Sequence, residues 1–135
     1  MLDRPDAAEL LEALAAFLDE EVVPAFEGGR RFHALVAANV ARILAREARE
    51  GERLAAEETS ELAALLGRGD NSAVPGEAQP QTRRDALYAA ATELCGRIER
   101  GDFDDGPKRI ALVTFLKRSV ERRLEIDNPK LKPSG

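Results

Sequence analysis

Apolar residues recur at three- and four-residue intervals in each long stretch of this chain that lies between its glycines and prolines. That spacing places them on one face of an α-helix, whereas a half-buried strand would need strict alternation. The pattern therefore predicts an all-α fold. The expected helices cover about residues 5–23, 30–50, 54–66, 83–100 and 107–125, which predicts a single-domain bundle of about five helices over residues 1–135.

Capping and breaking residues set the expected helix boundaries. Asp3 is the expected N-cap of the first helix, and Pro24 should end or kink it because its ring clashes with the preceding turn. Gly28–Gly29 then permits a sharp reversal, and Gly51 is expected to end the second helix. Residues 67–81 are expected to form a surface loop, and residues 126–135 a C-terminal tail.

Three helices carry broad apolar stripes that are expected to face the core. The stripe residues are Leu10, Leu14, Phe17, Leu18 and Val22; Phe32, Val36, Val40, Ile43 and Leu44; and Ile110, Val113, Leu116, Val120 and Leu124. The second helix has another face of small residues, Ala34, Ala38, Ala41 and Ala45. Such a ridge lets a neighbouring helix approach closely, so the second helix is expected to be central to the bundle.

The charge of the chain disfavours several classes of partner. Its net charge of −5 argues against nucleic-acid binding, which needs cations to replace phosphate counterions. No long uncharged apolar run is present, so we expect no membrane span, and the single cysteine is typical of a cytoplasmic protein. Residues 107–135 are basic and the rest of the chain is acidic, so the last helix is expected to be a basic element on an acidic body.

The second helix holds the candidate polar residues, in the run Arg31–Val40 (RFHALVAANV). His33 is the only histidine of the chain, so no His-based metal spacing surrounds it, and Asn39 lies at the seam between the apolar and arginine-bearing faces. We interpret Phe32, His33 and Asn39 as residues of a polar core or of an interface. A catalytic pairing of His33 with Cys95 lacks any flanking signature, so the sequence predicts no catalytic residue, metal or cofactor.

The fifth expected helix offers a candidate binding face. Phe115 projects away from the apolar stripe of that helix, on the same side as Arg118 and Arg122. An aromatic residue flanked by arginines on an outer face is typical of a protein-interface anchor. We therefore expect these three residues to contact a partner, unless the long loop or the tail covers them.

Three segments carry a family resemblance: residues 4–28, residues 31–47 (RFHALVAANVARILARE) and residues 120–129 (VERRLEIDNP). Together they resemble a family of small bacterial all-helical domains of unknown function. Domains of that family accompany aminoglycoside-phosphotransferase-like kinases and acyl-CoA dehydrogenases. In the family an aromatic residue usually follows the final Asn-Pro, whereas Lys130 and Leu131 follow it here.

The resemblance implies a non-catalytic accessory subunit of a small-molecule kinase system, of the hydroxyacyl-CoA type. Its partner would be the phosphotransferase-like kinase or a protein of the acyl-CoA dehydrogenase system. Two alternatives remain open at this point. The chain could be a self-associating structural bundle, such as a homodimer, or a small module that binds an acyl-CoA or phosphate ligand in a pocket near His33 and Asn39.

Overall fold

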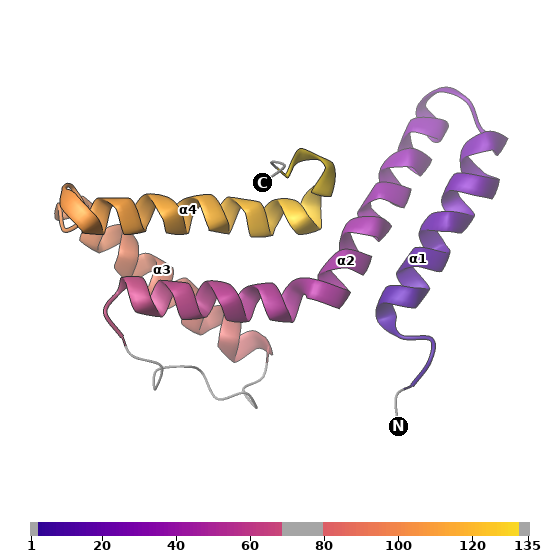
Figure 1. The fold of residues 1–135 in the computed structure, drawn as a ribbon. Helices are drawn as coiled ribbons and strands as arrows, with labels where there is room; N and C mark the ends of the chain where they lie inside the picture. The colour runs from indigo at the N-terminus through magenta and orange to yellow at the C-terminus, as the bar shows by residue number, and fades with distance from the viewer. Residues whose placement is uncertain (1–2, 69–79, 133–135) are drawn as a thin grey trace. The chain divides into compact units, whose positions relative to one another are not determined.

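The computed structural model describes residues 3–68 and 80–132. These residues form four α-helices, namely α1 (Ala7–Phe17), α2 (Gly28–Leu65), α3 (Pro80–Glu99) and α4 (Gly106–Asp127), which Figure 1 labels. None of the described residues lies in a strand, so the all-α prediction is confirmed. Within the same residues, no helix combines the length and the apolar character that a membrane span requires. Residues 69–79 of the predicted surface loop lie outside the described part of the chain.

Helix α1 begins three residues later than the capping pattern predicted at Asp3. Its N-cap is Asp6, whose carboxylate accepts a hydrogen bond from the Glu9 N–H at 2.8 Å. The Glu9 carboxylate in turn accepts a hydrogen bond from the Asp6 N–H at 2.9 Å, which completes a capping box. This reciprocal pair satisfies two backbone donors. Asp3 could not form the same pair, because the residue three positions after it is Asp6 and not the Glu or Gln of a capping box.

The turn after α1 follows the predicted breakers. The helix passes through a π-helical turn, Leu18–Val22, and then a 3₁₀ turn, Val23–Ala25, that contains Pro24. Gly28 has a φ of 64°, which L-residues rarely adopt, and α2 begins at this residue. The reversal predicted at Gly28–Gly29 is therefore confirmed.

Helix α2 is one element of 38 residues, so the predicted helix end at Gly51 is wrong. A glycine inside a helix costs only about 1 kcal/mol relative to alanine, and its neighbours can offset that cost. Here Arg53 donates to the Glu50 carboxylate at 2.8 Å across the glycine, and Leu54 is buried one turn further on. This continuity explains why the described residues form four α-helices where about five were expected.

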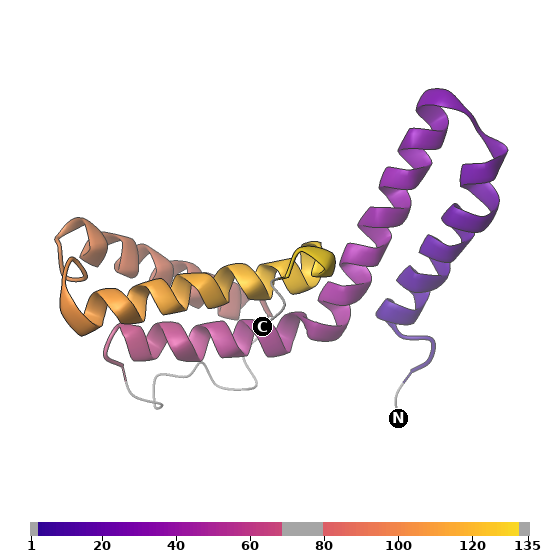
Figure 2. The same cartoon turned by 45° about the horizontal axis from the view of Figure 1, so that its top comes forward.

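The described residues group into two compact units. Unit 1 comprises residues 3–53 and 123–132, and unit 2 comprises residues 54–68 and 80–122. In unit 1, α1 and the first half of α2 lie side by side as an antiparallel hairpin (Figures 1 and 2). Its buried residues include six alanines, Ala8 and Ala15 on α1 and Ala34, Ala38, Ala41 and Ala45 on α2. The predicted alanine ridge is therefore buried, as close helix packing requires.

The predicted C-terminal tail begins inside a helix, which corrects its expected start at residue 126. Helix α4 continues to Asp127, and Ile126 is buried. A 3₁₀ turn, Pro129–Leu131, follows it. The Arg46 side chain of α2 donates to the Ile126 carbonyl at 2.6 Å, so this segment is fixed to unit 1 by a charged hydrogen bond at the end of α4.

Unit 2 has a separate apolar core. Its fully packed members are Leu62, Leu66, Leu94, Phe103, Leu112 and Phe115. They come from the second half of α2, from α3, from the turn after α3 and from α4. Arg97 of α3 donates to the Leu66 carbonyl at the C-terminal end of α2 at 3.1 Å, and this bond satisfies one of the unpaired carbonyls of that helix end.

Candidate interaction surfaces

The face of α4 that was expected to bind a partner is the face that packs into unit 2. Phe115 is 8% exposed and belongs to the core, and Arg122 is 8% exposed. Only Arg118 of the three predicted residues keeps an exposed side chain. The prediction of an outer Phe115 anchor is wrong because Leu112 and Phe115, one turn apart, provide the larger packing volume toward α2 and α3.

A polar network lies at the edge of this core. The Arg122 guanidinium donates to Glu61 at 3.1 Å, and Arg118 donates to the same carboxylate at 3.3 Å. Ser119 donates to Glu58 one turn earlier on α2. The Arg122 Nε atom is buried without a hydrogen-bond partner. These contacts give Arg122 and Glu61 a structural role, since the ion pair allows an arginine to be buried.

A hollow of about 400 Å³ lies on α2 next to this network, lined by Ala56, Glu57, Ser60 and Glu61. Two of its four lining residues are carboxylates. None of these four lining residues is a cation, so the hollow lacks the charged donors that the phosphate groups of an acyl-CoA ligand would need.

The outer face of α4 carries the apolar stripe that was expected to be core. Its residues are Ile110, Val113, Leu116 and Val120, which are 69%, 42%, 46% and 59% exposed. Arg109 and Lys117 lie on the same side of the helix, among the stripe residues, when the helix is drawn at about 100° per residue. We call this face the α4 outer stripe. Isolated exposed apolar residues are ordinary, but a contiguous row at helical spacing marks an interaction surface.

In unit 1 the candidate polar residues lie on the surface of α2. Phe32 is 63% exposed, and His33 and Asn39 are also exposed, so their assignment to a polar core is wrong. The Phe32 and His33 rings are 6.0 Å apart between centroids. The physical reason is that α1 packs against the alanine face of α2, which turns the larger apolar side chains away from α1. An interface role for Phe32, His33 and Asn39 stays a prediction.

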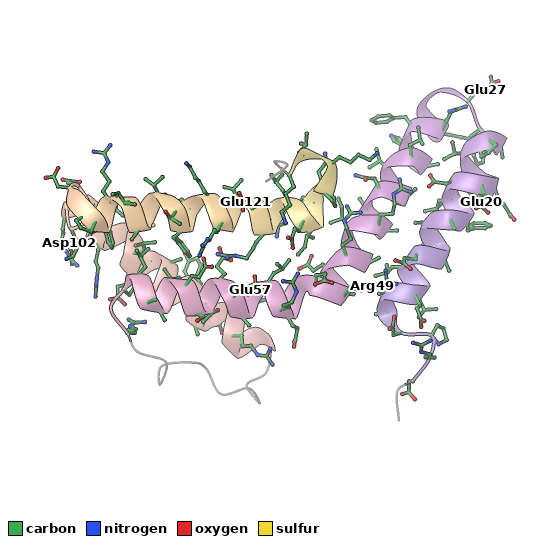
Figure 3. All side chains as sticks on the ribbon, viewed as in Figure 1. Glu20, Glu27, Arg49, Glu57, Asp102 and Glu121 are labelled. Carbon is green, nitrogen blue, oxygen red and sulfur yellow. The ribbon has the colours of Figure 1, made fainter. Side chains whose placement is uncertain are left out.

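The hairpin of unit 1 has one charged side. Glu12 of α1 accepts hydrogen bonds from Arg49 of α2, one of which measures 2.8 Å. Asp19, in the π-helical turn after α1, accepts a hydrogen bond from Arg42 of α2. Figure 3 labels Arg49 on α2. The Glu12 carboxylate raises the pKa of the Arg49 guanidinium, chiefly through the hydrogen bond between them. Together with Arg46, these arginines are already paired with protein groups, which competes with their use as phosphate ligands.

The opposite side of the hairpin is apolar and exposed. Its most exposed members are Leu10, Leu14 and Phe17 on α1 and Val36, Val40 and Leu44 on α2. At about 100° per residue, the α1 residues lie on the flank away from Glu12 and Asp19, and the α2 residues lie away from Arg42 and Arg49. These stripes were expected to be core, and that expectation is wrong for the isolated chain. We call this surface the hairpin apolar side.

Metal or nucleophile chemistry receives no support from the geometry of the described residues. Among them, no three His, Cys, Asp or Glu side chains are close enough together to hold a metal ion. Cys95 of α3 is an exposed free thiol. The surfaces that remain as candidates in the described part of the chain are therefore the α4 outer stripe and the hairpin apolar side.

Comparison with known proteins agrees with the family level of the resemblance. A family model described as "Domain of unknown function (DUF6285)" matches residues 24–131, which include all of α2, α3 and α4. The match begins after α1, so residues 4–23 of the first resembling segment lie outside it. No curated protein and no solved structure matches the chain. Since the family model covers most of its length, the chain belongs to this family of domains of unknown function, DUF6285.

Proposed function

We propose that this protein is a non-catalytic interaction subunit that binds a partner protein through the α4 outer stripe. The observation that carries the proposal is the exposure of Ile110, Val113, Leu116 and Val120 at helical spacing. Such a row is the pattern by which an amphipathic helix anchors in the groove of another protein. The opposite face of the same helix fills the core of unit 2, so the stripe is held on a rigid element.

The charges beside the stripe define the chemistry of the partner. Arg109 and Lys117 lie among the apolar residues of this face, so a complementary surface combines apolar side chains with carboxylates beside them. The partner class that the sequence resemblance suggests is a phosphotransferase-like kinase acting on a small molecule of the hydroxyacyl-CoA type, or another protein of the acyl-CoA dehydrogenase system. In that role the chain would stabilise the active form of the kinase without contributing a catalytic group.

Coexpression with a phosphotransferase-like kinase from the same organism, followed by size-exclusion chromatography, tests the proposal. We expect the two proteins to elute together. Leu116→Glu should weaken the complex by tenfold or more because it places a charge at the centre of the stripe. Thr114→Glu is the matched control, since Thr114 is exposed on the same helix outside the stripe and receives the same charge.

Separate elution of the two wild-type proteins, with kinase activity unaffected by removal of this chain, would refute the kinase as partner. Equal weakening by Leu116→Glu and Thr114→Glu would refute the α4 outer stripe as the contact surface. Circular dichroism of both variants shows whether the helices are retained, so a loss of binding is separated from a loss of fold.

A further inference from the structure

A second surface, on α2 of unit 1, has a symmetric arrangement of residues. The exposed or half-exposed residues on this face are His33, Val36, Val40, Leu44 and Glu47, spaced by three, four, four and three positions. At 3.6 residues per turn they form one row along the helix. The row is centred on Val40, and its two ends carry a histidine and a glutamate.

Both polar ends of this row lack partners in the described part of unit 1. No hydrogen bond or ion pair engages the His33 imidazole, whose described contact is the neighbouring Phe32 ring. Glu47 is half-buried and likewise forms no ion pair among the described residues. By contrast, Arg42, Arg46 and Arg49 on the other side of the hairpin have acidic or carbonyl partners.

An antiparallel copy of the same helix matches this row residue by residue. If a two-fold axis passes through Val40, then Val40 faces Val40 of the second copy, and Val36 faces Leu44 of the second copy. His33 then faces Glu47 of the second copy, and the same pair forms again at the other end of the row. A two-fold contact repeats every interaction twice, so the two ends give two pairs in which a histidine N–H can donate to a glutamate carboxylate.

The exposed area is also of the size that a dimer needs. A standard interface buries ~800 Å² per partner, and homodimer interfaces are about 65% apolar, which corresponds to about 500 Å² of apolar surface. The hairpin apolar side offers six Leu, Val and Phe side chains that are each about half exposed. A fully covered aromatic side chain buries roughly 150–250 Å², so half-exposed Phe17 supplies on the order of 100 Å² and the five aliphatic side chains add to it.

We propose that the hairpin apolar side is a two-fold interface with a second copy of this chain, in which the α2 helices pair antiparallel about Val40. The result is a bundle of four helices, two from each hairpin, with the Arg42–Asp19 and Arg49–Glu12 pairs on its outer sides. This interface uses residues of unit 1, whereas the α4 outer stripe belongs to unit 2, so the two proposals rest on different residues.

Cross-linking tests the position of the axis. A residue on a two-fold axis meets its own copy, so Val40→Cys should form a disulfide-linked dimer when oxidised glutathione accepts the two electrons. Cys95→Ser is included in every variant because Cys95 is an exposed thiol. Leu35→Cys is the matched control, since Leu35 is 42% exposed against 48% for Val40 but lies on another face of α2. We expect a covalent dimer for Val40→Cys and little for Leu35→Cys.

Charge exchange tests the pairing of the two ends. His33→Glu places two glutamates opposite each other at both ends, and we expect the dimer dissociation constant to rise by tenfold or more in analytical ultracentrifugation. Adding Glu47→Lys to the same chain should restore the dimer. Asn39→Glu adds the same charge at an exposed position on a different face of α2, so it serves as the control.

A monomer at high micromolar concentration in light scattering would overturn the proposal. Equal cross-linking of Val40→Cys and Leu35→Cys would also overturn it. So would failure of Glu47→Lys to restore the dimer of the His33→Glu variant. Each of these outcomes leaves partner binding by the α4 outer stripe intact, because Leu116→Glu and Thr114→Glu probe that surface separately.

Discussion

The Arg122 guanidinium of α4 lies buried against the Glu61 carboxylate of α2 at 3.1 Å. This ion pair is the main polar contact at the edge of the unit 2 core. Arg118 shares the same carboxylate from an exposed position at 3.3 Å. The stability contributions of a buried arginine, Arg122, and an exposed arginine, Arg118, can therefore be compared against the same carboxylate.

We expect Glu61→Gln to lower the free energy of unfolding by roughly 1–3 kcal/mol, because it leaves the Arg122 charge buried without compensation. Arg118→Gln should change the same quantity by less than about 0.5 kcal/mol, since exposed ion pairs contribute little. Urea denaturation of both variants measures the difference. Equal losses would show that Arg122 is not buried in solution.

Phe115 is expected to be a core residue in solution. Phe115→Ala should cost about 3–5 kcal/mol of stability through the cavity that it leaves in unit 2. Leu116→Ala, next to it but 46% exposed, should cost much less. Thermal unfolding of the two variants is the measurement, and a larger loss for Leu116→Ala would place the core of unit 2 on the other face of α4.

Close packing of the unit 1 hairpin depends on alanine at Ala38, which is 0% exposed. Ala38→Leu should destabilise the protein by about 1–3 kcal/mol or more, because the added volume forces α1 away from α2. Ala37→Leu inserts the same side chain at an exposed neighbouring position and should be tolerated. Urea unfolding compares the two, and an equally stable Ala38→Leu variant would contradict the close approach of the helices.

Two glycines are expected to respond in opposite directions to alanine substitution. Gly51→Ala should raise the stability by about 0.5–1 kcal/mol, because Gly51 lies inside α2 and its new Cβ would meet the flexible Glu47 side chain at 3.3 Å. Gly101→Ala should lower it, since Gly101 has a φ of 84° and its Cβ would lie 2.8 Å from the Asp104 carboxylate. Differential scanning calorimetry measures both, and a destabilising Gly51→Ala would argue for a helix break at that residue.

The contact between Lys132 and Glu125 is expected to depend on pH. The hydrogen bond from Lys132 lowers the pKa of the Glu125 carboxyl in the folded chain. Because the pKa of this carboxyl is lower in the folded chain, the contact stabilises the fold at a pH above the pKa of the unfolded chain, about 4.3 for glutamate. This stabilisation is lost as the pH falls through the lowered pKa of the folded chain. Lys132→Gln should therefore lower the Tm at pH 7 by a small amount, and the difference from the wild type should shrink below about pH 4. A difference that grows in acid would contradict this contact.

Several features of the fold could be predicted because they are local. Helical periodicity follows from side-chain spacing alone, so the all-α class needed no tertiary information. Gly28 could be identified as the reversal because few residues adopt its backbone conformation. The boundary at Gly51 failed for the opposite reason, since a glycine is compatible with both a helix end and a helix interior and only its neighbours decide between them.

The candidate surfaces were assigned to the wrong faces for one physical reason. Helices α2 and α4 each carry two faces that can be buried, and periodicity shows which residues share a face without showing which face has a neighbour. In α2 the alanine face is buried, and in α4 the face with Leu112 and Phe115 is buried. The more apolar stripes, with Val40 and Leu116, remain outside. No local signal in the sequence distinguishes these outcomes.

The sequence by itself determined that this chain is helical, that it reverses at Gly28–Gly29, and that alanines would permit close helix contact. Those properties depend on backbone preferences and on side-chain size within one segment. Only the tertiary structure decided that Phe115 and Arg122 are inside and that His33, Val40 and Leu116 are outside. That choice depends on which helices meet, because the shape of the neighbour and not the hydrophobicity of a stripe alone determines which face of a helix is buried.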